Sequence, residues 1–331
     1  MEDDFFRNAF RDEFPRLYWQ DRLIRLLGLQ SSSQLHAFIE KSLRNSRDPV
    51  TGLAVRREWF IALKNGLCRL HPELTQWESL SLGELFMVVS RFEPNIKAWV
   101  ALGDLAYVSL LNHFRGHSGG DEYLQSVGMV FRATEKIPYD LPGRLGGDEF
   151  VLMCLRQYAE VVKKTCGQIE DGVALIPLGI SGINLPSHID IGLANFSQAF
   201  GVFRANVEHL WREREAYPQG GRVKELVNIL VNLADRRSDA TKVYGRVRLL
   251  VDLILSDPLA FDKCFAFLSK GGGNISREDV IALARLKRAS PADYEDAVVK
   301  RALAPKATNS FLEARIEEVA LAPLRQAFGI T

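Results

Sequence analysis

A short stretch near the middle of the chain, residues 144–150 (RLGGDEF), combines two glycines with two adjacent carboxylates. Glycine pairs are favoured in tight turns between strands because they tolerate positive φ. Apolar residues resume at Phe150, so the pattern predicts a β-hairpin with Asp148 and Glu149 at its tip. An ordinary surface turn with incidental acids fits the same residues, and the choice between the two depends on the other polar positions.

A third carboxylate, Asp104, follows an apolar run over residues 96–102 that we expect to be a strand. The carboxyl end of a strand is where ligands bind in open α/β sheets. If this strand lies beside the hairpin, the three carboxylates repel one another unless a cation lies among them. Hard oxygen ligands suit Mg²⁺ that carries substrate phosphates. The spacing therefore predicts a magnesium site.

Two bases and two further polar residues add to this pattern. Lys242 and Arg246 are four positions apart on a predicted helix and could bind phosphates, although such pairs are more often a solvated face. Asn112 and Asp121 flank a glycine-containing segment that we expect to be a loop. A carboxylate such as Asp121 can accept two parallel hydrogen bonds from guanine but not from adenine. Together these residues predict a Mg²⁺-dependent site for a guanine nucleotide.

The elements that must position these residues are mostly predicted helices. Apolar residues recur at helical spacing over residues 1–45, which we expect to pack on the rest of the chain or on a second copy of it. Besides the strands above, we expect one over residues 173–180. Further segments with helical patterns are about 59–67, 79–92, 105–111, 122–135, 156–166, 196–210, 222–237, 239–255 and several up to about 328.

The composition of the 331-residue chain is that of a globular protein, with 47% hydrophobic and 25% charged residues. The formal charge of +1 gives no general attraction to nucleic acid or anionic membranes, so we expect neither partner. No apolar run approaches the roughly 18 residues of a membrane span, and the start is acidic where a signal peptide is basic. Four scattered cysteines are typical of free thiols. We expect a cytoplasmic protein.

The motifs resemble those of the GGDEF family of diguanylate cyclases. Residues 144–150 match the family's RxGGDEF signature, and residues 48–57 are similar to its DxLTGLxNRR opening, with Val where Asn is usual. Residues 112–121 fit its NDxxGHxxGD pattern, and residues 234–246 match its closing ADxxLYxAKxxGRN. Asp104 lies eight positions before that second pattern, where the family keeps a metal-binding Asp.

The resemblance implies a domain organisation and a fold. We expect an N-terminal helical segment over residues 1–45, a GGDEF domain over 46–250 and a C-terminal helical segment over 251–331. We interpret residues 184–230 as an insertion, because the spacing there is longer than the family's. The implied fold is a palm-like α/β domain, with a mostly antiparallel central sheet flanked by helices.

The resemblance also implies an activity. Two such domains face each other as a homodimer and join two GTP molecules into cyclic di-GMP with Mg²⁺ as cofactor. The residues implied are listed by role: Asp104, Asp148 and Glu149 for metal; Asp148 and Glu149 for catalysis, with Glu149 assisting deprotonation of the 3′-hydroxyl; Asn112 and Asp121 for guanine; Gly146 and Gly147 for close approach of the nucleotide; Lys242 and Arg246 for the β- and γ-phosphates.

Several positions depart from the family pattern. Ala106 replaces the second Asp of a DxD motif, and Ser109 replaces a Lys that contacts phosphate. His113 and Val247 replace an Asp and an Asn, and residues 237–238 (Arg-Ser) replace a Leu-Tyr pair. These changes leave open a second function, that of a catalytically inactive GGDEF scaffold that binds GTP or a protein partner. A regulatory partner would then bind through the flanking helices.

Overall fold

A computed structural model describes residues 46–94, 97–135, 140–178, 187–215, 220–271, 275–308 and 310–328. The expected N-terminal helices over residues 1–45 lie outside the described residues. Within the described chain, no helix is both long enough and apolar enough to cross a membrane. The four cysteines are free thiols, and three of them are buried.

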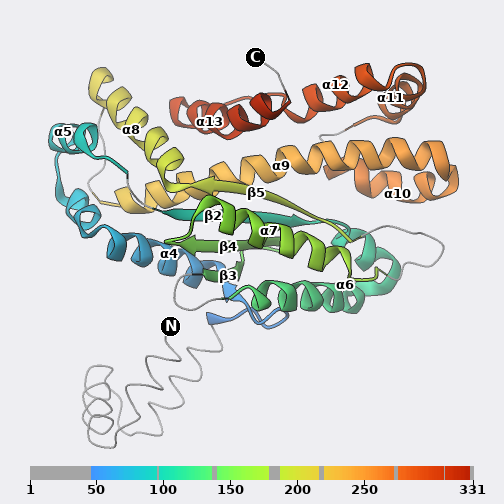
Figure 1. Ribbon diagram of the computed structural model, residues 1–331, viewed down its shortest axis with the longest axis horizontal. Coiled ribbons are helices and arrows are strands. Elements are labelled where there is room, and N and C mark those ends of the chain that lie inside the picture. The colour runs from blue at the N-terminus through green and yellow to red at the C-terminus, as the bar shows by residue number, and fades with distance from the viewer. Residues whose placement is uncertain are drawn as a thin grey trace, which may run out of the picture.

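A five-stranded sheet forms the centre of the fold (Figure 1). Its strand order is β1-β3-β4-β2-β5, in which β1 pairs with β3 in parallel and the other three pairings are antiparallel. The strands are β1 (Ala54–Val55), β2 (Ala98–Leu105), β3 (Asp140–Arg144), β4 (Glu149–Leu155) and β5 (Ile189–Asn195). This mostly antiparallel sheet flanked by helices confirms the expected α/β fold class.

Helices cover both faces of the sheet, because alternate residues of each strand are apolar on opposite sides. One face packs against α6 and α7, and the other against α4, α5, α8 and the first half of α9. Figure 1 shows α9 running along β5, with α10 alongside its C-terminal half and α11 to α13 on its other side. The helices are α4 (Arg56–Leu70), the 3₁₀-helix η1 (Pro72–Ser79), α5 (Leu82–Arg91), α6 (Val108–Ala133), α7 (Ala159–Ala174), α8 (Phe196–Glu213), α9 (Arg222–Ser256), α10 (Pro258–Gly271), α11 (Arg277–Ala289), α12 (Pro291–Ala302) and α13 (Phe311–Ala327).

The close contact between α9 and β5 depends on a glycine. A Cβ at Gly192 would lie 1.9 Å from the backbone oxygen of Ala234 and 2.3 Å from the backbone nitrogen of Ser238. The Ser238 hydroxyl donates to the backbone oxygen of Asp190, 2.6 Å away. The helix backbone therefore lies directly on the strand, and this contact sets the position of the bases one and two turns further along α9.

Three expectations from the sequence were wrong in detail. The loop expected between Asn112 and Asp121 is part of α6, whose direction changes at Gly116, where φ is 72°. The strand expected over residues 173–180 does not form in its described part, because Val173 continues the helical row of α7. The insertion expected over residues 184–230 stays a prediction, and β5, which pairs with β2 along its whole length, lies within that interval. The two helices expected over 222–255 are one continuous helix, α9.

Candidate functional site

The β3–β4 turn presents the two carboxylates of the hairpin as the sequence predicted. Arg144 holds this turn, because its Nε donates to the Gly146 oxygen at 3.0 Å and its Nη2 to the Gly147 oxygen at 2.6 Å. Its Nη1 donates to Oδ1 of Asp48 at 3.0 Å. The same Asp48 oxygen accepts from the backbone N–H and the hydroxyl of Thr51. One mostly buried ion pair thus joins the motif at residues 48–57 to the motif at residues 144–150.

The two glycines of the turn do not use the left-handed region that the sequence led us to expect. Among the described glycines, positive φ occurs at four other positions. Gly146 instead leaves room for a carboxylate, since a Cβ there would lie 2.8 Å from Oε2 of Glu149. A Cβ at Gly147 would meet no atom within 4 Å, so this position is open to an approaching ligand.

Replacing Arg144 with alanine is expected to lower the free energy of unfolding by about 1–3 kcal/mol, because it leaves a mostly buried carboxylate and two turn carbonyls without their donor. Urea denaturation measures this loss. Arg115→Ala removes a more exposed ion pair with Glu122 and is the matched control, with an expected loss of under about 0.5 kcal/mol. Equal losses for the two variants would contradict the structural role of Arg144.

The Asp48 carboxylate also makes stability depend on pH. Burial raises its pKa, but hydrogen bonds from Thr51 and Arg144 outweigh burial and hold the pKa below the ordinary 3.8. A lowered pKa stabilises the fold above the ordinary value, and this stabilisation is lost as the pH falls through the folded-state pKa. The stability difference between wild type and Asp48→Asn, measured by urea denaturation, should therefore shrink as the pH falls below about 4. A difference that stays constant over this range would contradict the assignment.

Asp104 lies where the predicted carboxylates and bases meet. In the sheet register it is opposite Glu149 on β4 and opposite Asp190 on β5, so the three side chains share one face. Lys242 on α9 donates from Nζ to Oδ2 of Asp104 at 2.6 Å, and Nη2 of Arg246 lies 3.6 Å from Oδ1. The structure therefore brings together four residues that the sequence assigned to one site.

The polar atoms at this junction are not all satisfied. Burial raises the pKa of Asp104, and the nearby Asp148 adds to this effect, while Lys242 and Arg246 oppose it. Oδ1 of Asp104 and Nε of Arg246 are buried and make no hydrogen bond with any described residue. Such orphaned atoms are rare in folded proteins unless a ligand or water completes them.

Asp104 and Asp148 fit a magnesium ion only if a bound substrate supplies further oxygen ligands. Nowhere in the described chain do three or more His, Cys, Asp or Glu side chains lie together as a metal site. Mg²⁺, however, commonly takes one or two protein carboxylates and fills its other positions with phosphate oxygens and water. Oδ1 of Asp104, which accepts no hydrogen bond from the described residues and lies near Asp148, would be the protein oxygen in such a substrate-completed site.

The kink in α6 brings the two expected guanine-binding positions near each other. A Cβ at Gly120 would lie 2.0 Å from Oδ1 of Asn112, so the Asn112 side chain packs against the residue next to Asp121. Asn112 is half-buried and Asp121 is exposed. Both side chains are therefore carried by rigid helix turns on either side of Gly116.

Sequence reasoning missed three polar residues beside this site. Asp190, only 1% exposed, pairs with Nε2 of His188 at 3.0 Å, and this bond raises the pKa of His188. Burial, with Asp239 and Glu149 nearby, raises the pKa of Asp235 to about 6. The alternation of residues 189–195 (IDIGLAN) could have indicated a strand with Asp190 on the site's face.

A family model described as "Diguanylate cyclase, GGDEF domain" matches residues 87–201. Residues 87–201 thus match the GGDEF domain family. The matched interval contains Asp104, the α6 kink and the hairpin turn, and it ends within α8. Residues 46–86 and the bases on α9 lie outside it, so the extent of the domain over 46–250 stays a prediction.

Similar proteins include one from Streptomyces griseus, "Uncharacterized protein in hutH 5′region", 31% identical over 133 residues. The match covers 40% of this chain and 46% of that protein, so the chain spans about half the length of this relative. Among solved structures, the coiled coil and GGDEF domain of DgcB from Caulobacter crescentus, in complex with c-di-GMP, is 19% identical, with 60% of this chain and 96% of that chain covered and a TM-score of 0.39. Diguanylate cyclase SiaD from Pseudomonas aeruginosa, in complex with its activator SiaC, is 20% identical. The match covers 64% of this chain and 74% of that chain, with a TM-score of 0.35.

Proposed function

We propose that this protein is a diguanylate cyclase that condenses two GTP molecules into cyclic di-GMP across a homodimer. The observation that carries the proposal is the convergence of Lys242 and Arg246 on Asp104, beside the turn that holds Asp148 and Glu149. This arrangement has the charges needed to bind a triphosphate and a divalent cation together.

Each group has a role in binding. The triphosphate, which carries more negative charge than one carboxylate, would compete with Asp104 for Lys242 and Arg246. Asn112 and Asp121 bind the guanine edge, and the open backbone at Gly147 admits the nucleotide. Asp104 and Asp148 would hold Mg²⁺, which supplies charge neutralisation to the phosphates when bound.

The reaction is a phosphoryl transfer performed twice. The 3′-hydroxyl oxygen of one GTP forms a bond to the α-phosphorus of the other, and the bond from that phosphorus to pyrophosphate breaks. Glu149, opposite Asp104 in the sheet, accepts the hydroxyl proton. The second, symmetric step closes the ring and releases a second pyrophosphate. Positioning and charge neutralisation supply most of the rate enhancement in such transfers.

The second candidate is a GGDEF scaffold that binds GTP or a protein partner without turnover. Two departures favour it. Ala106 is buried and offers no carboxylate, and Ser109, at the start of α6, is exposed where the family has a phosphate-binding Lys. A regulatory partner would bind the flanking helices in this case.

Incubation of the purified protein with GTP and Mg²⁺, followed by chromatography of the nucleotides, separates the two candidates. A cyclase gives cyclic di-GMP at a rate that rises more than linearly with protein concentration, because two protomers form each site. ATP in place of GTP is the control for base selection. Bound GTP without product at any protein concentration would contradict the cyclase and favour the scaffold.

A further inference from the structure

One face of α9 carries two acids followed by two bases. Asp235, Asp239, Lys242 and Arg246 are spaced by four, three and four residues, which places them in one row along the helix. The two bases contact Asp104. Asp239 precedes Lys242 by three residues on the same helix, and Lys242 contacts Asp104, so the acidic end of the row borders the nucleotide site.

A lysine from the C-terminal segment binds this acidic end. Lys306 lies between α12 and α13, and its Nζ is 2.5 Å from Oδ2 of Asp239. It also acts on Asp235, whose pKa it lowers against the effect of burial. Lys306 is 67 residues from Asp239 in the sequence, so only the packing of the C-terminal helices on α9 brings this charge to the row.

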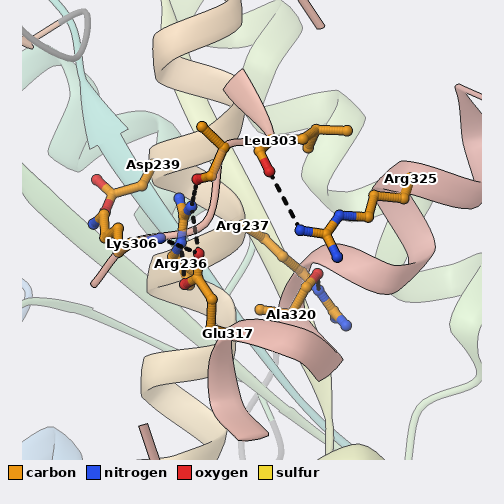
Figure 2. A network of polar contacts seen from close by, with 9 residues as sticks. Arg236, Arg237, Asp239, Leu303, Lys306, Glu317, Ala320 and Arg325 are labelled. Atoms are coloured by element: carbon orange, nitrogen blue, oxygen red, sulfur yellow. Dashed lines mark hydrogen bonds and ion pairs between the residues drawn. The ribbon is translucent and has the colours of Figure 1, made fainter. Parts of the chain in front are cut away.

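The loop that carries Lys306 is held by a buried ion pair (Figure 2). The Lys306 backbone N–H donates to Oε1 of Glu317 at 2.9 Å. The same oxygen accepts from Nη2 of Arg236 at 2.8 Å, and Nη2 of Arg236 also donates to the Ala304 oxygen at 3.0 Å. Arg236 is next to Asp235 in α9. The backbone of Lys306 is thus fixed relative to the row, although its side chain is partly exposed.

A nucleoside triphosphate is a polyanion, and the acids at 235 and 239 oppose its binding to Lys242 and Arg246. A cation paired with those acids reduces this repulsion. We propose that Lys306 is a positioning residue of the nucleotide site, which neutralises the acidic end of the α9 row so that the row itself has a net positive charge where the triphosphate binds. The proposal rests on the proposed function and assigns part of the site to the C-terminal segment.

Binding of 3′-deoxy-GTP with Mg²⁺ tests this proposal, because the analogue lacks the attacking hydroxyl and measures affinity without turnover. By isothermal titration calorimetry, Lys306→Ala should bind roughly three-fold more weakly than wild type, since the charge is solvent-screened. Lys306→Arg should bind as wild type does. The loss in Lys306→Ala should shrink at high salt.

Asp239→Asn distinguishes an electrostatic role from a structural one. If the ion pair only holds the C-terminal segment, Asp239→Asn and Lys306→Ala both break it and both weaken binding. In our proposal Asp239→Asn binds at least as tightly as wild type, and adding it to Lys306→Ala restores affinity. Lys287→Ala removes an equivalent pair with Asp252, also on α9 but beyond the bases, and should leave affinity unchanged.

The outcomes separate this proposal from the one it rests on. Wild-type affinity in Lys306→Ala, or weaker binding in Asp239→Asn, would overturn the role of Lys306 and leave the nucleotide site standing. A wild-type protein that binds no guanine nucleotide would overturn both.

Discussion

Asp148→Asn is expected to reduce the rate of cyclic di-GMP formation by at least about a thousandfold, because it removes a carboxylate that we assign to the metal and the transferring phosphate. The change is nearly isosteric. The contact that joins Asp148 to the sheet is made by its backbone oxygen, which accepts from the Leu105 N–H at 2.8 Å and is kept in the variant. Chromatographic product assays over a range of Mg²⁺ concentrations measure the effect.

The controls for Asp148→Asn separate lost chemistry from lost structure. Thermal denaturation should show the wild-type melting temperature to within about 2 °C, as for a partly exposed turn side chain. Asp121→Asn is the matched comparison, because it changes a carboxylate that we assign to the base and not to the reacting phosphate. It should lower the preference for GTP over ATP more than it lowers the maximal rate. Wild-type turnover by Asp148→Asn would contradict the cyclase mechanism.

Arg237→Leu is expected to lower the free energy of unfolding by about 3 kcal/mol, which would be a large loss for a single substitution. Arg237 is buried and donates to four oxygens on three elements: Leu193 of β5, Gln198 of α8 at 3.0 Å, and Val319 and Ala320 of α13 at 3.1 and 2.9 Å. Leucine fills part of the volume but removes all four hydrogen bonds, and it leaves a buried acceptor such as the Val319 oxygen without this donor, which costs more than the hydrogen bond itself contributes. Urea denaturation measures the loss.

The Val319 carbonyl shows why a hydrophobic residue at position 237 does not compensate for the lost hydrogen bonds. Pro323 lies inside α13 and has no N–H to donate to the carbonyl four residues earlier, so Arg237 supplies the donor instead. Arg212→Leu on α8 is the matched control, because its side chain is 74% exposed and makes only an i,i+4 pair with Glu208. It should change stability by under about 0.5 kcal/mol. Equal stability of the two variants would show that the contacts of Arg237 do not hold α13.

Arg237 also gives a physical account of one departure from the family pattern. Arginine and serine occupy residues 237–238, where the family has leucine and tyrosine. In the fold both side chains bind backbone oxygens of β5, namely those of Leu193 and Asp190. The arginine extends this contact to α13. These two residues therefore help to attach α9 and α13 to the edge strand β5. Their difference from the family pattern has this structural reason and is not by itself an argument against cyclase activity.

Local pattern was sufficient for the features that depend on neighbouring residues. The hairpin at residues 144–150 follows from a glycine pair with an apolar strand directly after it, and α4 follows from the spacing of Trp59, Leu63 and Leu67. Lys242 and Arg246 were placed on one helix face by their separation alone, and α9 presents both to the same carboxylate. The motif spacings also indicated the GGDEF family from the sequence alone.

Only the tertiary structure decided which distant charges meet. Asp190 lay in an interval that looked like an insertion, and the pairing of β5 with β2 places it opposite Asp104. Lys306 and Arg237 carry no local signal, because their partners are 67 residues away or are backbone oxygens of other elements. Periodicity in a sequence reports which face of an element is apolar, whereas contacts between elements depend on how those faces pack. The sequence by itself therefore determined the hairpin, the α9 bases and the family, and the packing of α9 against β5 and α13 decided the surroundings of the site.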